Sequence, residues 1–175
     1  MVDANQTYAP KAAIAAIARW AEHGVELVEQ PTPGDDLAGL AMVTRATSIA
    51  IEADESAQSL AEIARLAHER VVDSINLRIM NLGGIRAVLA AVAICEGAGI
   101  AYRFGATFGP RLFQAQCAHV AATLPRIGFA HELAEFNHIL DDPFTGLEVV
   151  DGALAAPPGP GCGVSLREPA RRAAE

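Results

Sequence analysis

Three acidic residues recur along this chain at the period of one strand, one helix and two loops. Asp3, Glu29 and Asp54 each close a short apolar run and each precede a helix-like stretch, at intervals of 26 and 25 residues. This period is typical of a (β/α) barrel, in which the carboxyl ends of neighbouring parallel strands lie side by side. Convergent carboxylates repel one another unless a cation neutralises them, and an all-oxygen set suits a hard divalent ion such as Mg²⁺. The pattern therefore predicts a metal site.

The composition is that of a well-packed domain without a basic surface. Hydrophobic residues make up 51% of the 175 positions, which is enough for a sizeable core in one domain. The net charge of −8 gives no footprint for nucleic acid or for an anionic membrane. The sequence opens without a signal peptide, and no apolar run is long enough for a membrane span. Three cysteines without metal-ligand spacing favour reduced thiols, and we expect a cytoplasmic protein.

The same period continues beyond the three acidic residues. Arg78 follows Asp54 by 24 residues at the end of a further apolar strand, and Gly83-Gly84 opens the next helix. We expect strands over residues 25–29, 49–54, 71–79, 100–104 and, more weakly, 128–132. We expect helices over residues 10–23, 37–46 after an Asp35 or Asp36 cap, from Ser56 or Ser59 to about 70, from 84 to 97–99, and over 110–123.

About six strand–helix units are too few to close a barrel, because closure needs eight strands and typically about 250 residues. The expected fold class is α/β, with an incomplete TIM-type (β/α) barrel over residues 1–140 and a turn-rich tail over 141–175. An open sheet leaves strand edges and apolar surface uncovered. We therefore expect the C-terminal part of a larger enzyme, which forms a homo-oligomer or associates through its uncovered barrel edges.

Several short motifs give the chain a family resemblance. Asp3-Ala4-Asn5 and Val28-Glu29-Gln30-Pro31, on either side of an alanine-rich helix, resemble the D-x-N…E-x-P pattern of the enolase superfamily, in its mandelate racemase and muconate lactonizing branch. The other matches are Ala53-Asp54-Glu55-Ser56 with A-D-E-S, Gly83-Gly84-Ile85 with G-G-I, and Asp151-Gly152 with Pro160-Gly161-Cys162-Gly163-Val164 for D-G…P-G-L-G-V. The resemblance implies strands three to eight of the family barrel without the N-terminal capping domain, toward which the tail packs in the family.

The resemblance also implies an activity. In the family pattern Asp3, Glu29 and Asp54 hold Mg²⁺, with Mn²⁺ as an alternative ion. The metal binds a small carboxylate substrate and stabilises the enolate formed when a base removes the α-proton. Glu132-Leu133, followed nine residues later by Asp141-Asp142, resembles the E-L…D-D pattern of muconate cycloisomerases, in which the glutamate faces the reacting centre. Glu132 is thus the implied catalytic carboxylate.

The acid/base residues depart from the family pattern. Ile75-Asn76-Leu77-Arg78 stands where muconate-type enzymes carry I-N-x-K, and that lysine is their acid/base on one face of the substrate. Arginine stays protonated, with a pKa above about 12. Arg78 is therefore interpreted either as an electrostatic clamp for a substrate carboxylate or as part of a structural ion pair.

Several residues close to the predicted metal ligands are interpreted as groups that support the site. Strand alternation directs Glu52 toward the barrel interior, where a pair with Arg78 is one interpretation and an exposed strand position is the other. Asn5, Gln30 and Glu55 each follow a predicted ligand by one or two residues. They are interpreted as groups that orient the ligands or cap helices.

Two hypotheses from different classes remain open. The first is a Mg²⁺-dependent enzyme of the muconate cycloisomerase or racemase type, which abstracts a proton α to a substrate carboxylate. The second is a catalytically inactive, truncated remnant that lacks the acid/base lysines and the capping domain. Lys11 is the only lysine and sits in an expected helix, which favours the second hypothesis for the chain by itself.

Overall fold

The structure, a computed structural model, describes residues 1–125 and 128–168, and these form two compact units. The first contains residues 1–103 and 128–130, and the second contains the other described residues. The expected division at residue 140 stays a prediction, and residues 169–175 of the expected tail lie outside the described part. No helix among the described residues is long and apolar enough to cross a membrane.

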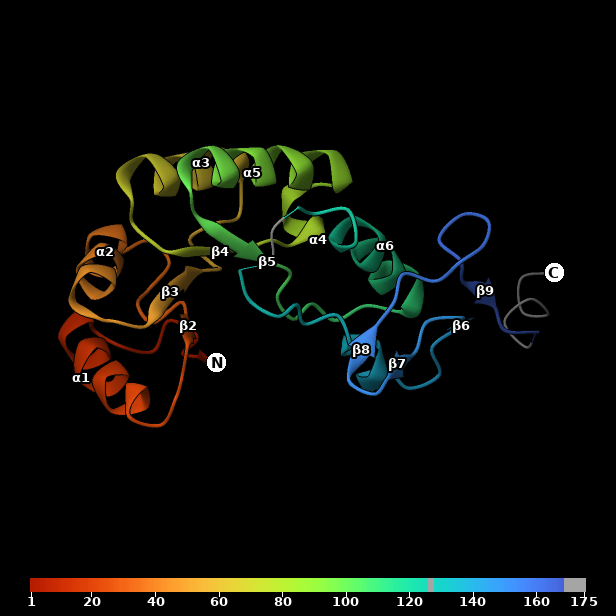
Figure 1. Ribbon diagram of the computed structural model, residues 1–175, viewed down its shortest axis with the longest axis horizontal. Coiled ribbons are helices and arrows are strands. Elements are labelled where there is room, and N and C mark those ends of the chain that lie inside the picture. Colours follow the sequence, from red (N-terminus) through yellow and green to blue (C-terminus); the bar gives the residue numbers. More distant parts are fainter. Residues whose placement is uncertain (126–127, 169–175) are drawn as a thin grey trace. The chain divides into compact units, whose positions relative to one another are not determined.

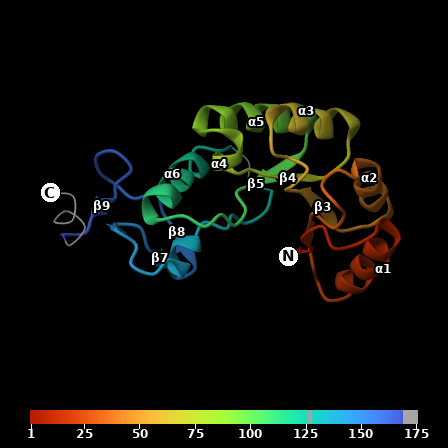
Figure 2. The same cartoon turned by 180° about the vertical axis from the view of Figure 1, so that it is seen from behind.

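The first unit is built on a five-stranded parallel sheet whose strand order follows the sequence (Figure 1). Its strands are β1 (Val2–Asp3), β2 (Leu27–Glu29), β3 (Ala50–Ala53), β4 (Ser74–Asn76) and β5 (Ala101–Arg103). Its helices are α1 (Pro10–Ala21), α2 (Leu37–Ala46), α3 (Leu60–Glu69), α4 (Ile79–Leu82) and α5 (Ile85–Ala98). Helix α1 packs against α2 and α3 against α5, as Figure 2 also shows from behind. The expected α/β class with parallel strands is confirmed.

The two faces of this sheet differ in chemistry. Because side chains alternate along a strand, residues that are partners in register share a face. Val28 pairs with Ile51, and Ile75 pairs with Ala53 and Tyr102, so one face is apolar and fully buried. The other face carries register partners that are polar: Asp3 with Glu29, Glu29 with Glu52, Glu52 with Ser74, and Asn76 with Arg103.

Local capping explains where two of the helices begin. The Asp36 carboxylate accepts a hydrogen bond from the Gly39 N–H at 2.8 Å, so Asp36 rather than Asp35 caps α2. Ser59 accepts from the Glu62 N–H at 3.2 Å, and its hydroxyl lies 3.0 Å from the Glu62 carboxylate. The bond from the Glu62 N–H makes Ser59 the N-cap, which places the start of α3 after Ser59 rather than after Ser56.

One strand in the structure is shorter than predicted, and another predicted strand is absent from the described residues. The strand expected over residues 71–79 is confined to Ser74–Asn76, and α4 begins at Ile79 instead. Gly83, whose φ is 85°, caps the C-terminal end of α4. The strand expected over residues 128–132 is wrong, since none of these residues has strand structure. One bond of the expected ladder is present, from the Glu132 N–H to the Phe104 carbonyl at 2.8 Å. A single bond does not make a ladder.

The second unit contains one long helix and small antiparallel pairs. Its elements are α6 (Arg111–Ala121), a 3₁₀ turn (Glu135–His138), β6 (Phe144–Thr145) with β9 (Ser165–Leu166), and β7 (Val149–Val150) with β8 (Ala153–Leu154). Ala115, Phe136 and Leu147 form its core. Arg111 pairs with the buried Asp142 at 3.0 Å. Within the expected turn-rich tail, Asp141 and Asp151 lie in turns, with φ values of 53° and 49°.

Two leucines of opposite burial make the packing testable by stability measurements. Leu40 on α2 is fully buried, whereas Leu140 is 91% exposed. We expect Leu40→Ala to lower the free energy of unfolding by about 2–5 kcal/mol, since it loses transfer energy and leaves a cavity. The matched change Leu140→Ala should alter it by less than about 0.5 kcal/mol. Urea denaturation followed by circular dichroism measures both, and equal effects would contradict the packing described.

Thiol reactivity should follow burial. All three cysteines are free, as expected, and burial raises the pKa of the Cys95 and Cys117 thiols to about 12. At pH 9 only roughly one thiol in a thousand of such a group is ionised, and the thiolate is the reactive form. We expect iodoacetamide to modify the partly exposed Cys162 first and to reach the other two only in urea. Mass spectrometry after digestion reports this order, and early labelling of Cys95 would contradict it.

Candidate functional site

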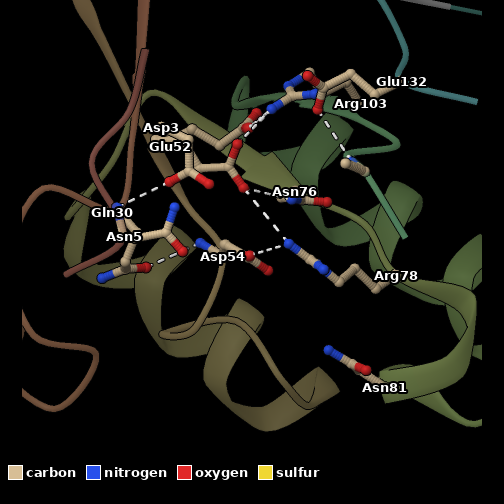
Figure 3. Close-up of polar contacts among 12 residues, drawn as sticks. Asp3, Asn5, Gln30, Glu52, Asp54, Asn76, Arg78, Asn81, Arg103 and Glu132 are labelled. Atoms are coloured by element: carbon tan, nitrogen blue, oxygen red, sulfur yellow. Dashed lines mark hydrogen bonds and ion pairs between the residues drawn. The ribbon is translucent and has the colours of Figure 1, made fainter. Parts of the chain in front are cut away.

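The carboxyl end of the polar sheet face carries four of the residues that the sequence singled out (Figure 3). Asp3 ends β1 and Glu29 ends β2, and the two are partners in register. Asp54 directly follows β3, and Arg78 follows β4 by two residues. Parallel strands place such positions at one edge of the sheet. The expected grouping of these four residues is therefore present.

Glu29 is held from two sides. Its Oε1 accepts a hydrogen bond from the Asn76 side-chain amide at 2.7 Å. Its Oε2 accepts one from Arg103 Nη2, also at 2.7 Å. Glu29 is only 2% exposed, so these donors replace the water that a surface carboxylate would bind. The orientation of Glu29 is thus fixed by β4 and β5.

Arg103 bridges two carboxylates in the interior. The same Nη2 atom lies 2.7 Å from Glu29 Oε2 and 2.7 Å from Glu52 Oε2. Glu52 also accepts a hydrogen bond from the Ser74 hydroxyl at 2.7 Å. The side chains of Arg103 and Glu52 are fully buried. A guanidinium suits this position because it donates several hydrogen bonds in a fixed plane and keeps its charge when buried.

Arg78 does not pair with Glu52, and that interpretation of the sequence is wrong. Its Nη2 instead contacts Asp54 Oδ2 in a short ion pair and lies 3.8 Å from Glu29 Oε1. The physical reason is position along the strands. Glu52 is level with Ser74, whereas Arg78 lies four residues further along the chain, beyond the end of β4.

Gln30 fixes the loop that carries Asp54. Its Oε1 accepts hydrogen bonds from the Asp54 N–H at 2.9 Å and from the Ser56 N–H at 3.2 Å. Its Nε2 donates to the Ser56 hydroxyl at 2.9 Å and to the Thr32 carbonyl at 3.0 Å. Gln30 is fully buried and has a φ of 33°. The side chain therefore ties the end of β2 to the end of β3.

Asn5 and Glu55 have weaker roles in the described contacts. The Asn5 N–H donates to Asp3 Oδ1 at 2.9 Å, which orients the Asp3 carboxylate through the backbone rather than through the amide side chain. Glu55 is half-buried, and burial, together with the charge of Asp54, raises its pKa.

Burial destabilises the charged forms of the inward carboxyl groups, and the neighbouring arginines stabilise those forms in part. Burial and the neighbouring Glu52 charge raise the pKa of Glu29 to about 8, against the lowering effect of Arg103. Burial raises the pKa of Glu52 and of Asp54, while Arg103 and Arg78 respectively lower it. The positive charges of Arg103 and Arg78 thus offset part of the cost of burying these carboxyl groups.

The predicted ligands fit a hard divalent cation in kind. Asp3, Glu29 and Asp54 supply carboxylate oxygens from three neighbouring strand ends, and the charge of Asp3 raises the pKa of the other two. Across residues 1–125 and 128–168, however, no group of three His, Cys, Asp or Glu side chains is arranged to hold a metal ion. Coordination by these residues stays a prediction.

Glu132, the implied catalytic carboxylate, lies in the second unit. Its Oε2 accepts a hydrogen bond from the Ala106 N–H at 3.1 Å. The neighbouring His131 accepts one from the Phe104 N–H at 3.0 Å through Nδ1. Both side chains are half-buried. These contacts tether residues 131–132 to the segment that follows β5.

Sequence reasoning missed Ser74, Asn76 and the ion pairs of Arg103. One signal was available, because Ser74 and Asn76 alternate with the apolar Ile75 in an expected strand. Alternating polar residues beside Glu29 and Glu52 on neighbouring strands indicate a polar sheet face. The acidic partners of each arginine depend on the three-dimensional distances between the side chains, which the sequence does not give.

The structure thus defines an α/β domain whose parallel sheet carries acidic residues at the carboxyl ends of neighbouring strands. The chain belongs to the family described as Enolase C-terminal domain-like, which it matches over residues 1–170. The resemblance to the mandelate racemase and muconate lactonizing branch is confirmed by this match and by named relatives.

The relatives include two kinds of isomerase. The chain is 40% identical over 167 residues to a chloromuconate cycloisomerase of Cupriavidus necator, covering 94% of this chain and 45% of the relative. It is 36% identical over 169 residues to an L-Ala-D/L-Glu epimerase of Bacillus subtilis, covering 93% and 45%. The solved 2-chloromuconate cycloisomerase of Rhodococcus opacus superposes with a TM-score of 0.92 at 30% identity, covering 98% and 47%. The chain thus spans less than half the length of these relatives.

The buried bridge at Arg103 can be tested by its removal. We expect Arg103→Met to lower the free energy of unfolding by about 3–5 kcal/mol near pH 8, because Glu29 and Glu52 must then either stay charged in the interior without the guanidinium or take up protons. A carboxyl whose folded pKa exceeds its unfolded value of about 4.5 takes up a proton on folding, so stability falls as pH rises. The loss should therefore shrink toward pH 5. Urea denaturation at both pH values measures it.

Two variants serve as controls for this bridge. Glu52→Gln combined with Arg103→Met should recover part of the loss, since one uncompensated charge is gone. Arg65→Met breaks an exposed ion pair with Glu69 on α3 and should cost no more than about 1 kcal/mol. A loss from Arg103→Met no larger than that from Arg65→Met would contradict the bridge.

Proposed function

We propose that this chain forms the barrel portion of a divalent-metal-dependent enzyme that removes a proton α to the carboxylate of a small substrate. The observation that supports it is the position of Asp3, Glu29 and Asp54 at the ends of three neighbouring strands on one edge of the sheet, in a chain that belongs to the Enolase C-terminal domain-like family. Burial raises the free energy of the charged forms of Glu29 and Asp54. Carboxyl groups that are kept at such a cost are typical of catalytic and binding sites.

In this proposal Asp3, Glu29 and Asp54 hold Mg²⁺ or Mn²⁺. The chemistry supplied by such a bound ion is Lewis-acid stabilisation of negative charge on the substrate carboxylate. Asn76 and Arg103 keep the Glu29 carboxylate in one orientation through their hydrogen bonds. Gln30 holds the backbone of Asp54. Fixed ligands cost no reorganisation at the moment of reaction.

The proton-transfer groups are assigned by chemistry. Glu132 is the proposed catalytic carboxylate, since its hydrogen bond from the Ala106 N–H holds it in one orientation and a positioned carboxylate can act as a general base. Arg78 does not serve as a base because it stays protonated at all working pH values. We assign it the role of a cationic clamp for an anionic group of the substrate.

The substrate class follows from the relatives and from the acidic site. The names of the relatives point to chloromuconate, muconate and a dipeptide that ends in glutamate, all of which are carboxylates. A small carboxylate is therefore the proposed substrate, and cycloisomerisation or epimerisation is the proposed reaction class. The three free cysteines favour a reducing, cytoplasmic location.

One observation favours the alternative, a chain without turnover of its own. Arg78 stands where muconate-type enzymes carry an acid/base lysine, and its guanidinium contacts Asp54 directly. A positioned base typically contributes about 10²–10⁴-fold to the rate. A chain with arginine here therefore lacks one of its two expected proton-transfer groups.

Proton exchange into D₂O separates these possibilities. With Mg²⁺ and a panel of muconates and L-Ala-L-Glu, we expect the 175-residue chain to exchange α-protons no faster than a metal-free control. Fusion to the N-terminal portion of the Cupriavidus necator relative, combined with Arg78→Lys, should restore exchange. The fusion that keeps Arg78 should be slower by about 10²–10⁴-fold, since only one base is present. Proton NMR measures each rate.

Matched variants show whether the assigned residues carry the restored activity. In the active fusion, Asp54→Asn and Glu132→Gln should each abolish most exchange. Asp35→Asn, which changes an exposed acidic residue, should leave the rate unchanged. If the unmodified chain exchanges protons well above the metal-free control, another group is the base and the assignment is wrong.

A further inference from the structure

Arg78 occupies the place on the carboxylate cluster where a cation is expected. Its Nη2 contacts Asp54 Oδ2 and lies 3.8 Å from Glu29 Oε1, so one guanidinium faces two of the three proposed metal ligands (Figure 3). Both contacts come from a side chain that is itself three-quarters buried. The guanidinium therefore neutralises the same oxygens that a divalent cation would bind.

This neutralisation is permanent with respect to pH. A lysine ammonium at this position could lose its proton when a dication approaches, whereas arginine stays charged. Two positive groups at one pair of carboxylates repel each other strongly where water is excluded. The guanidinium and a dication therefore cannot share the oxygens of Asp54 and Glu29 without one of them moving.

Arg78 is anchored in a way that permits such movement. It precedes α4 with an extended backbone, and its side chain is 25% exposed. Its Nε atom is buried and has no hydrogen-bond partner among the described residues. The guanidinium is thus held at its far end by the carboxylates alone, in contrast to Arg103, which lies fully buried between Glu29 and Glu52.

We propose that Arg78 is a built-in competitor of the divalent cation, which must leave Asp54 and Glu29 before a metal ion binds there. This inference rests on the proposed metal site and adds that the resting site is closed by an internal cation. Metal affinity is consequently set by Arg78 as well as by the ligands. Removal of the guanidinium should tighten metal binding rather than weaken it, which is the opposite of what a supporting residue would do.

Mn²⁺ binding to the full chain tests this directly. Free Mn²⁺ is measured by electron paramagnetic resonance during titration of wild type, Arg78→Gln and Arg65→Gln. A charge-assisted hydrogen bond of the kind donated by Arg78 is worth about tenfold or more in an equilibrium constant. We expect Arg78→Gln to lower the dissociation constant by at least about that factor, whereas Arg65→Gln, which removes the same charge from an exposed pair on α3, should match wild type.

Two further variants keep the test decisive. Arg78→Gln combined with Asp54→Asn should lose the gain, because the ion no longer has its Asp54 ligand. Circular dichroism confirms folding of each variant, and Arg78→Met, which retains the aliphatic stem, replaces Arg78→Gln if the latter is unfolded.

The outcomes separate this inference from the metal site on which it rests. Equal, tight binding by wild type and Arg78→Gln would overturn the competitor role and leave the metal site standing. Absence of binding by both proteins would overturn the competitor role together with the proposed metal site. A gain in Arg78→Gln that survives Asp54→Asn would place the ion elsewhere and also overturn the inference.

Discussion

Charge compensation on the polar face of the parallel sheet is the constraint on which the first unit depends. Glu29, Glu52 and Asp54 are all buried there, and isolated buried carboxylates are too costly to remain charged. Arg103 compensates the deeper pair and Arg78 the pair at the strand ends. The opposite face is apolar and packs in the ordinary way. Each strand of the sheet therefore contributes apolar side chains to one face and polar or charged side chains to the other.

The two layers explain why the site lies where it does. Backbone pairing between parallel strands fixes Glu29 beside Glu52, and Gln30 fixes the loop that carries Asp54. Glu29, Glu52 and Arg103 lie in the strands themselves, whereas Asp54 and Arg78 follow strands β3 and β4 within two residues. Rigid elements position functional groups more accurately than loops do. The carboxylate geometry is thus a product of strand register.

Much of this architecture could be predicted from the sequence. The helix over Leu37–Ala46 was predicted to the residue, because the Asp36 cap and the apolar period agree. The prediction of a strand over residues 128–132 was wrong, since hydrophobic periodicity does not show whether a short apolar segment pairs with a neighbouring strand. The grouping of Asp3, Glu29 and Asp54 followed from the repeat. The partners of Arg78 did not, because a long side chain reaches several acidic groups and its choice depends on three-dimensional distance.

The bridge between Glu52 and Arg103 also bears on how this sequence can change over time. Substitution of either residue alone passes through a state with a buried, uncompensated charge, and such states are strongly destabilised. Exchange of the whole buried group, which includes Glu29 as the second partner of Arg103, for apolar residues of similar volume is often neutral. The charged and the apolar versions of this bridge can both be stable, but the single substitutions that lead from one to the other are destabilising. Glu52 and Arg103 lie on strands β3 and β5, far apart in the chain, yet they are expected to vary only together, as one inherited unit.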